Sequence, residues 1–128
     1  MHISLTPRAL AHSIIAGLLV AFFIAGGISN LFPTADFRAE YARWGYPDWF
    51  HYMTGSLELA AAALLARAGT RHRGALLGGG VMTAALATLL LAGEWLHAAL
   101  PLAVLMAIAA CLYLDEKARE AVWEGKIF

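Results

Sequence analysis

Apolar positions along this chain fall into four long runs, and the short segments between them hold most of the charge. The runs cover about residues 9–31, 49–66, 74–96 and 101–114. About twenty consecutive apolar residues are enough for a helix to cross a bilayer. The pattern predicts an all-α, integral membrane four-helix antiparallel bundle, formed as a single domain over residues 1–128.

The segment between the first two runs has a helical period of its own. Phe37, Tyr41 and Trp44 recur at i, i+4 and i+7, and charged residues occupy the other positions. This spacing is typical of a short amphipathic helix that lies at a membrane interface. We expect that helix over residues 36–44.

Pro101 stands at the start of the last apolar run. The first turn of a helix tolerates proline, because the missing N–H would have no partner there. The connection before this helix is therefore expected at residues 97–100. Past residue 114 the helix can continue into water, because Asp115 and Arg119 are i, i+4 neighbours of opposite charge.

Basic residues gather on one side of this four-span pattern, and only Arg38 and Arg43 fall on the other side. The larger group consists of Arg8, Arg67, Arg71, Arg73, Lys117, Arg119 and Lys126. The positive-inside rule then predicts a multi-pass protein of the bacterial inner (plasma) membrane with both termini cytoplasmic. The formal net charge of zero gives no indication of nucleic-acid binding.

Glu58 is an acidic residue within the apolar stretch 55–66, in a chain that is 61% hydrophobic. A charged side chain at the centre of a spanning helix costs about 2.5–3.5 kcal/mol, and such residues usually face a partner, a substrate or the bundle interior. At about 1.5 Å per residue, Glu58 lies roughly 13 Å below Trp49. It is either a functional carboxyl or a hydrogen-bonded group that holds helices together.

Other polar and aromatic residues fall near the outer ends of the spans, and His51 shares a helix face with Glu58. If the helix faces agree, these residues converge in a cavity that opens toward the outer leaflet. The aromatic residues are otherwise a belt at the headgroups. Besides Glu58 and His51, the candidate ligand-binding residues are Asn30, Tyr46, Trp49, Tyr52, Glu94, Trp95 and His97.

Metal and haem chemistry have little support. Glu94 and His97 form a Glu-x-x-His unit, but a carboxylate-bridged di-iron site needs two such units, and the chain has one. Haem ligation by His51 or His97 would lack an attachment motif. Cys111 is the only cysteine, so the chain alone cannot relay electrons between paired thiols.

The segment 44–50, with the sequence Trp-Gly-Tyr-Pro-Asp-Trp-Phe, precedes Gly-Ser-Leu-Glu-Leu at 55–59. In a chain of this size these motifs resemble the DoxX-like family. The resemblance implies a four-helix membrane protein related to a subunit of a thiosulfate:quinone oxidoreductase. Family members often carry a Thr-His pair in the third helix, whereas here Thr88 is followed by Leu89. The matching positions are Gly26, Trp44, Gly45, Tyr46, Pro47, Gly55 and Glu58.

The leading hypothesis is a cavity that holds a small lipophilic molecule, with a quinone as one candidate, in a component of a quinone-linked oxidoreductase. Glu58 would donate or accept a proton, because desolvation favours its neutral form, and His51 would relay it. The alternative is a non-catalytic membrane anchor or accessory subunit for a soluble redox partner, so whether the chain is an enzyme stays open. The small residues at 74–78 also predict a homo-oligomer in the bilayer.

Overall fold

The computed structural model describes residues 6–125, which are helical with no strand. The elements are α1 (Pro7–Leu31), α2 (Ala35–Arg43), α3 (Phe50–Ala66), the short 3₁₀ helix η1 (Ala68–Thr70), α4 (Arg71–Leu91) and α5 (Trp95–Trp123). The all-α class is confirmed. The short amphipathic helix is found as α2, one residue displaced from its expected start and end.

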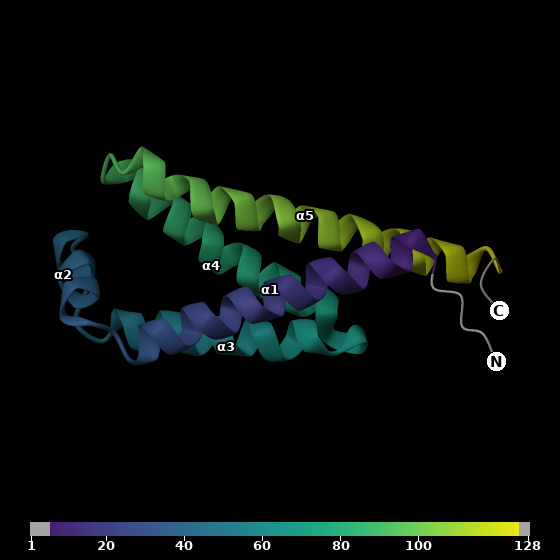
Figure 1. Cartoon of the computed structure of the whole chain (residues 1–128), viewed down its shortest axis with the longest axis horizontal. Coiled ribbons are helices and arrows are strands. Elements are labelled where there is room, and N and C mark those ends of the chain that lie inside the picture. Colours follow the sequence, from purple (N-terminus) through teal and green to yellow (C-terminus); the bar gives the residue numbers. More distant parts are fainter. Residues whose placement is uncertain (1–5, 126–128) are drawn as a thin grey trace.

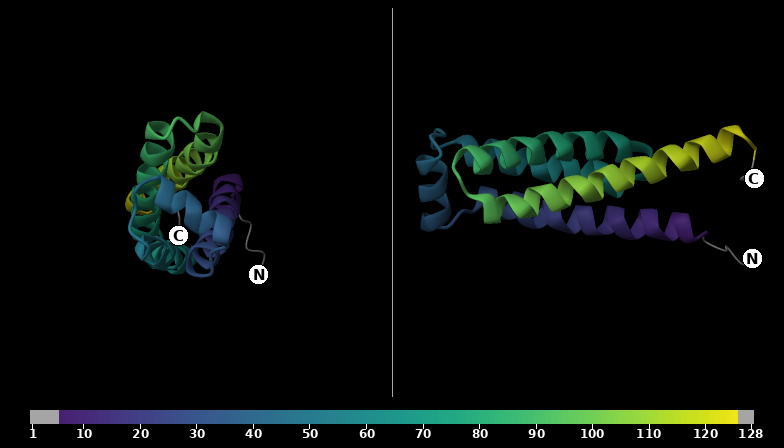
Figure 2. Two further views of the ribbon diagram at one scale, coloured as in Figure 1. Left: turned by 90° about the vertical axis from the view of Figure 1, so that its left-hand side faces the viewer. Right: turned by 90° about the horizontal axis from the view of Figure 1, so that it is seen from above.

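The long helices α1, α3, α4 and α5 run lengthwise, and α2 lies across one end of them (Figure 1). Helix α1 packs against α3 and α5, and α4 packs against the same two helices. The start of α1 and the end of α5 lie at the end opposite α2 (Figure 2). The basic residues of α1, α4 and α5 therefore lie far from Arg38 and Arg43 of α2, while Lys126 lies outside the described residues.

Within residues 6–125, three helical segments are long and apolar enough to cross a membrane: Pro7–Leu31, Ala68–Leu91 and Ala99–Trp123. Helix α3 has 17 residues and carries Glu58. It is shorter than each of these three segments. Crossing by all four long helices therefore stays a prediction.

The connection between α4 and α5 lies earlier than the sequence predicts. Helix α4 ends at Leu91, and Gly93 follows with a φ of 75°. Glycine adopts this left-handed conformation without strain, which ends the helix. The expected third helix over 74–96 and the expected connection at 97–100 are therefore wrong at these boundaries, because the connection is at 92–94.

Helix α5 begins at Trp95, so Pro101 lies inside the helix. The expected place of Pro101 in the first turn is wrong. Its ring nitrogen has no hydrogen for the carbonyl of residue 97, four positions earlier. As expected, the helix continues beyond the apolar run and ends at Trp123. Asp115 and Arg119 form an i, i+4 ion pair of 3.2 Å in this part of the helix.

Glycines bring the long helices close together. A Cβ atom at Gly55 of α3 would lie 2.8 Å from the carbonyl oxygen of Gly27 in α1. A Cβ atom at Gly74 of α4 would lie 2.6 Å from the backbone nitrogen of Leu65 in α3, and one at Gly78 would meet the ring of Phe23. These faces are thus occupied within the chain, and the homo-oligomer stays a prediction.

Candidate functional site

A cavity of about 830 Å³ lies toward the end of the molecule that α2 covers. Its walls come from α1, α2, α3, α4 and the start of α5, and most of the side chains that line it are apolar. Pockets that hold small molecules usually measure about 300–1,000 Å³ and place a few polar groups in an apolar lining. The cavity therefore has the size and character of a ligand site.

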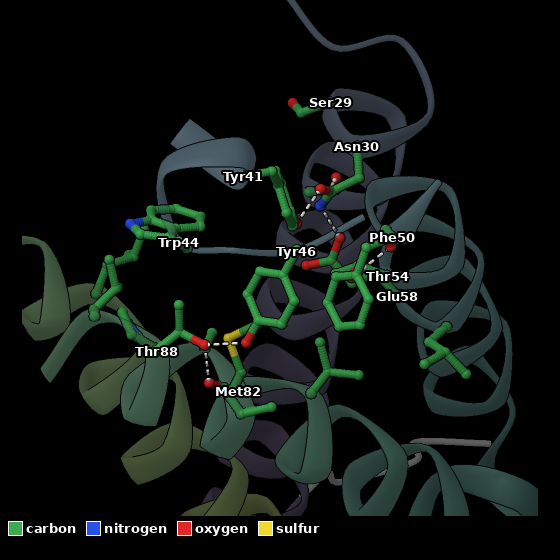
Figure 3. Close-up of a pocket in the computed structure, with 18 of the residues that line it drawn as sticks. Ser29, Asn30, Tyr41, Trp44, Tyr46, Phe50, Thr54, Glu58, Met82 and Thr88 are labelled. Atoms are coloured by element: carbon green, nitrogen blue, oxygen red, sulfur yellow. Dashed lines mark hydrogen bonds between the residues drawn. The ribbon is translucent and has the colours of Figure 1, made fainter. Parts of the chain in front are cut away.

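A hydrogen-bonded chain of three side chains lies on the cavity wall (Figure 3). Asn30 of α1 donates from Nδ2 to Glu58 Oε2 of α3 over 2.7 Å. The Tyr41 hydroxyl of α2 donates to Asn30 Oδ1 over 2.6 Å. Glu58 is 4% exposed and Asn30 5%. One network therefore joins three helices around a buried carboxyl, and the predicted meeting of Asn30 with Glu58 is present.

The second carboxyl oxygen of Glu58 has no hydrogen-bond donor within residues 6–125. Figure 3 shows it turned to the side on which Tyr46 lies. Nor does Glu58 form an ion pair with any basic side chain in this part of the chain. Buried carboxyls usually have several hydrogen bonds or a countercharge. One face of this group is thus available to a molecule in the cavity.

His51 is also buried, with 4% exposure, but it lies behind the network. Its Nδ1 is 2.7 Å from the carbonyl oxygen of Asn30. It lines a separate cavity of about 380 Å³ together with Tyr41 and Tyr52, and it does not line the large one. His51 therefore contacts the backbone of Asn30, and no direct hydrogen bond connects it to Glu58 among the described residues.

A second polar group lines the cavity where α5 begins. Glu94 Oε1 lies 2.7 Å from Arg43 Nη1 and accepts a hydrogen bond of 3.1 Å from Trp44 Nε1. Glu94 Oε2 is 3.0 Å from His97 Nδ1. The hydrogen bonds from His97 and Trp44 hold the pKa of Glu94 below its usual range. Glu94 is thus a charged carboxylate that ties α2 to α5.

Tyr46, in the segment between α2 and α3, connects that segment to α4. Its hydroxyl hydrogen-bonds to Thr88 Oγ1, and it is the donor, because Thr88 Oγ1 itself donates to the carbonyl of Ala84 over 2.9 Å. The Tyr46 ring stacks on Phe50 with the centroids 4.1 Å apart. Tyr46 therefore forms part of the wall, as the sequence predicts.

Three predicted aromatic residues lie elsewhere. Trp49, Tyr52 and Trp95 are 58%, 46% and 70% exposed, and none of them lines the large cavity. Their predicted ligand-binding role has no support from the geometry of this cavity. Their exposure is what a belt at the membrane interface requires.

Sequence reasoning did not select Tyr41 and Trp44 as site residues, although both line the cavity and hydrogen-bond there. Their spacing could have identified them, because it placed both on the same face of the amphipathic helix. Thr88 had no such signal: its partner Tyr46 lies 42 positions away in the chain.

Within residues 6–125 no group of three or more His, Cys, Asp or Glu side chains could hold a metal ion.

The sequence profile of the DoxX-like family matches residues 14–111. This range contains every residue that lines the large cavity. No curated protein and no solved structure shows a significant match.

Proposed function

The chain belongs to the DoxX-like family, and from this premise we propose that its large cavity binds a small lipophilic molecule through Glu58. One observation carries the proposal. Glu58 is buried on the wall of a mostly apolar cavity, with one carboxyl oxygen held by Asn30 and the other without a donor in the described chain. A polar group of the ligand would complete the hydrogen bonding of that oxygen.

In this proposal Glu58 donates a proton to the bound molecule or accepts one from it. The side chain is within reach of the cavity, which is the first requirement for general acid–base chemistry. Asn30 fixes the carboxyl through Oε2, and Tyr41 fixes the Asn30 amide. The carboxyl is therefore held in one orientation before the ligand arrives.

The membrane setting belongs to the same proposal. All four long helices cross the bacterial inner membrane, α2 lies at the outer surface, and both termini are cytoplasmic. The support is the concentration of basic residues at the end opposite α2, together with the three segments that can cross by length and composition. The cavity then lies in the outer half of the membrane, where lipophilic molecules partition.

A quinone fits this proposal as one candidate, because its carbonyl oxygens can accept a hydrogen bond from a protonated Glu58. Quinone turnover would also need electrons from a soluble oxidoreductase partner. The competing function is a membrane anchor or accessory subunit for such a partner, in which Glu58 only stabilises the fold.

Native mass spectrometry of the protein in mild detergent, followed by organic extraction, tests the proposal. We expect wild type to retain a lipophilic molecule that Glu58→Gln loses by about tenfold, as the loss of one hydrogen bond predicts. Glu116→Gln is the matched control, because Glu116 is exposed and does not line the cavity. Thermal unfolding confirms that each variant is folded.

Equal retention in all three proteins would overturn the role of Glu58. A wild-type cavity that is empty, in a protein that still captures a soluble redox partner, would support the accessory subunit instead.

A further inference from the structure

The charged side chains on the cavity wall are acidic. Among the described residues three glutamates line it, namely Glu40, Glu58 and Glu94, and no lysine or arginine does. Two of the glutamates have a cation nearby, because Arg43 lies 2.7 Å from Glu94 and 3.8 Å from Glu40. Only Glu58 has no basic side chain as partner in the described chain.

Aromatic rings surround the same part of the cavity. Tyr41 has its ring centroid 6.0 Å from that of Tyr46 and 6.2 Å from that of Phe50. Figure 3 shows these three rings around the Glu58 carboxyl. The negative π faces of aromatic rings attract positive charge, most strongly where water is excluded. A carboxyl and several rings on one wall form an environment that favours a cation.

We propose that the ligand of this cavity is a lipophilic organic cation, such as an amphiphilic amine, whose positive charge pairs with Glu58 among the rings of Tyr41, Tyr46 and Phe50. This inference rests on the proposed binding function of the cavity and names the chemical class of its ligand. An anion would find no basic Lys or Arg side chain in the described lining. A neutral molecule would leave the ionised form of Glu58 without a countercharge, which a cation supplies.

At low pH a proton occupies the Glu58 carboxyl in the empty cavity. A permanent cation then releases that proton when it binds, so its affinity rises with pH until Glu58 is ionised in the free protein. Helix α4 contributes no charged or titratable side chain to the lining, and its one polar side chain there is the neutral Thr88. The titratable and charged groups on the other packed elements are Tyr41, Glu40 and Arg43 of α2, Tyr46, His51 of α3 behind Asn30, and Glu94 and His97 at the start of α5.

His97 is the histidine in the described lining of the large cavity. It hydrogen-bonds to Glu94 and is exposed. A His97→Asn variant therefore removes this imidazole and leaves Glu58 unchanged. The pH dependence of cation binding should persist in His97→Asn and disappear in Glu58→Gln.

The test compares two probes of the same shape: a phenylbutyl-trimethylammonium ion, and the hydrocarbon in which carbon replaces its nitrogen. Equilibrium dialysis measures both on the full chain in detergent. We expect the affinity of wild type for the cation to be at least about tenfold higher than its affinity for the hydrocarbon. Glu58→Gln should lose this preference and keep its affinity for the hydrocarbon, which also shows that its cavity is intact. Glu116→Gln should match wild type.

Failure of this inference differs from failure of the proposed function. Equal binding of the two probes, or tighter binding of a short-chain quinone that depends on Glu58, overturns the cation inference and leaves a ligand cavity. If neither the probes nor the quinone binds, both proposals are overturned.

Discussion

Gly26 of α1 lies directly against the carboxyl group of Glu58 in α3. A Cβ atom at position 26 would lie 2.8 Å from Glu58 Oε1 and 3.1 Å from Cδ. These separations are shorter than van der Waals contact, so the position of the carboxyl depends on the absence of a side chain at Gly26. The glycine therefore makes room for the carboxyl group, in addition to its place in a helix interface.

Gly26→Ala is expected to move the Glu58 carboxyl and weaken its 2.7 Å hydrogen bond with Asn30. The fold should survive, because the end of a flexible side chain can shift while the backbone stays in place. We predict a loss of ligand affinity of about tenfold with a stability change of no more than about 1 kcal/mol. Ligand retention and thermal unfolding measure the two effects.

Gly17→Ala is the control, because it lies in the same helix and a Cβ atom there would meet nothing within 4 Å. It should leave ligand retention unchanged. If Gly26→Ala also behaves like wild type, the carboxyl position does not control binding.

Gly55→Ala is expected to act on the fold instead of the carboxyl. The added Cβ atom would lie 2.8 Å from the carbonyl oxygen of Gly27 and 2.9 Å from Cβ of Asn30. Backbone atoms cannot rotate away, so α1 and α3 must separate, which typically costs about 1–3 kcal/mol. Thermal unfolding in detergent should show this loss for Gly55→Ala and none for Gly80→Ala, where a Cβ atom would meet nothing within 4 Å. Equal stability of the two variants would contradict the close approach.

Local features of this fold could be predicted from the sequence. The apolar runs give the helices, and the period of Phe37, Tyr41 and Trp44 gives α2. The end of α4 could not be placed from the apolar run alone, because Leu89 to Leu91 continue it and Gly93 interrupts it by conformation. Hydropathy measures burial or lipid exposure, and it contains little information on a single residue with positive φ.

The candidate site could be predicted in part for a similar reason. Glu58 and Asn30 are identified by polarity in apolar surroundings, and they meet as expected. The direction in which His51 and Trp95 point depends on helix rotation, which a sequence without tertiary contacts fixes only to within tens of degrees. Successive residues of a helix point about 100° apart, so an error of one position is enough to move a side chain from the cavity to the outer surface of the helices.

Tyr41→Phe is predicted to loosen the network at Glu58 from its far end. It removes the donor to Asn30 Oδ1 and leaves a buried amide oxygen without that partner, at a cost of about 1–3 kcal/mol. Thermal unfolding measures the loss. Tyr52→Phe makes the same chemical change at a ring that is 46% exposed and should have little effect. A Tyr41→Phe protein as stable as Tyr52→Phe would show that the hydroxyl is not needed to hold Asn30.

Glu94 should make the stability of the protein sensitive to acid. The hydrogen bonds from His97 and Trp44 hold the pKa of Glu94 below its usual range. The unfolded chain therefore binds this proton more readily, so the contribution of Glu94 is fully present above the ordinary carboxyl range and is lost as the pH falls through the folded value. The melting temperature of wild type should fall between about pH 6 and pH 3. Glu94→Gln should be less stable at neutral pH and depend less on pH over this range, whereas Glu116→Gln should follow wild type. Parallel pH curves for wild type and Glu94→Gln would show that the contacts of Glu94 with Arg43 and Trp44 do not stabilise the folded chain.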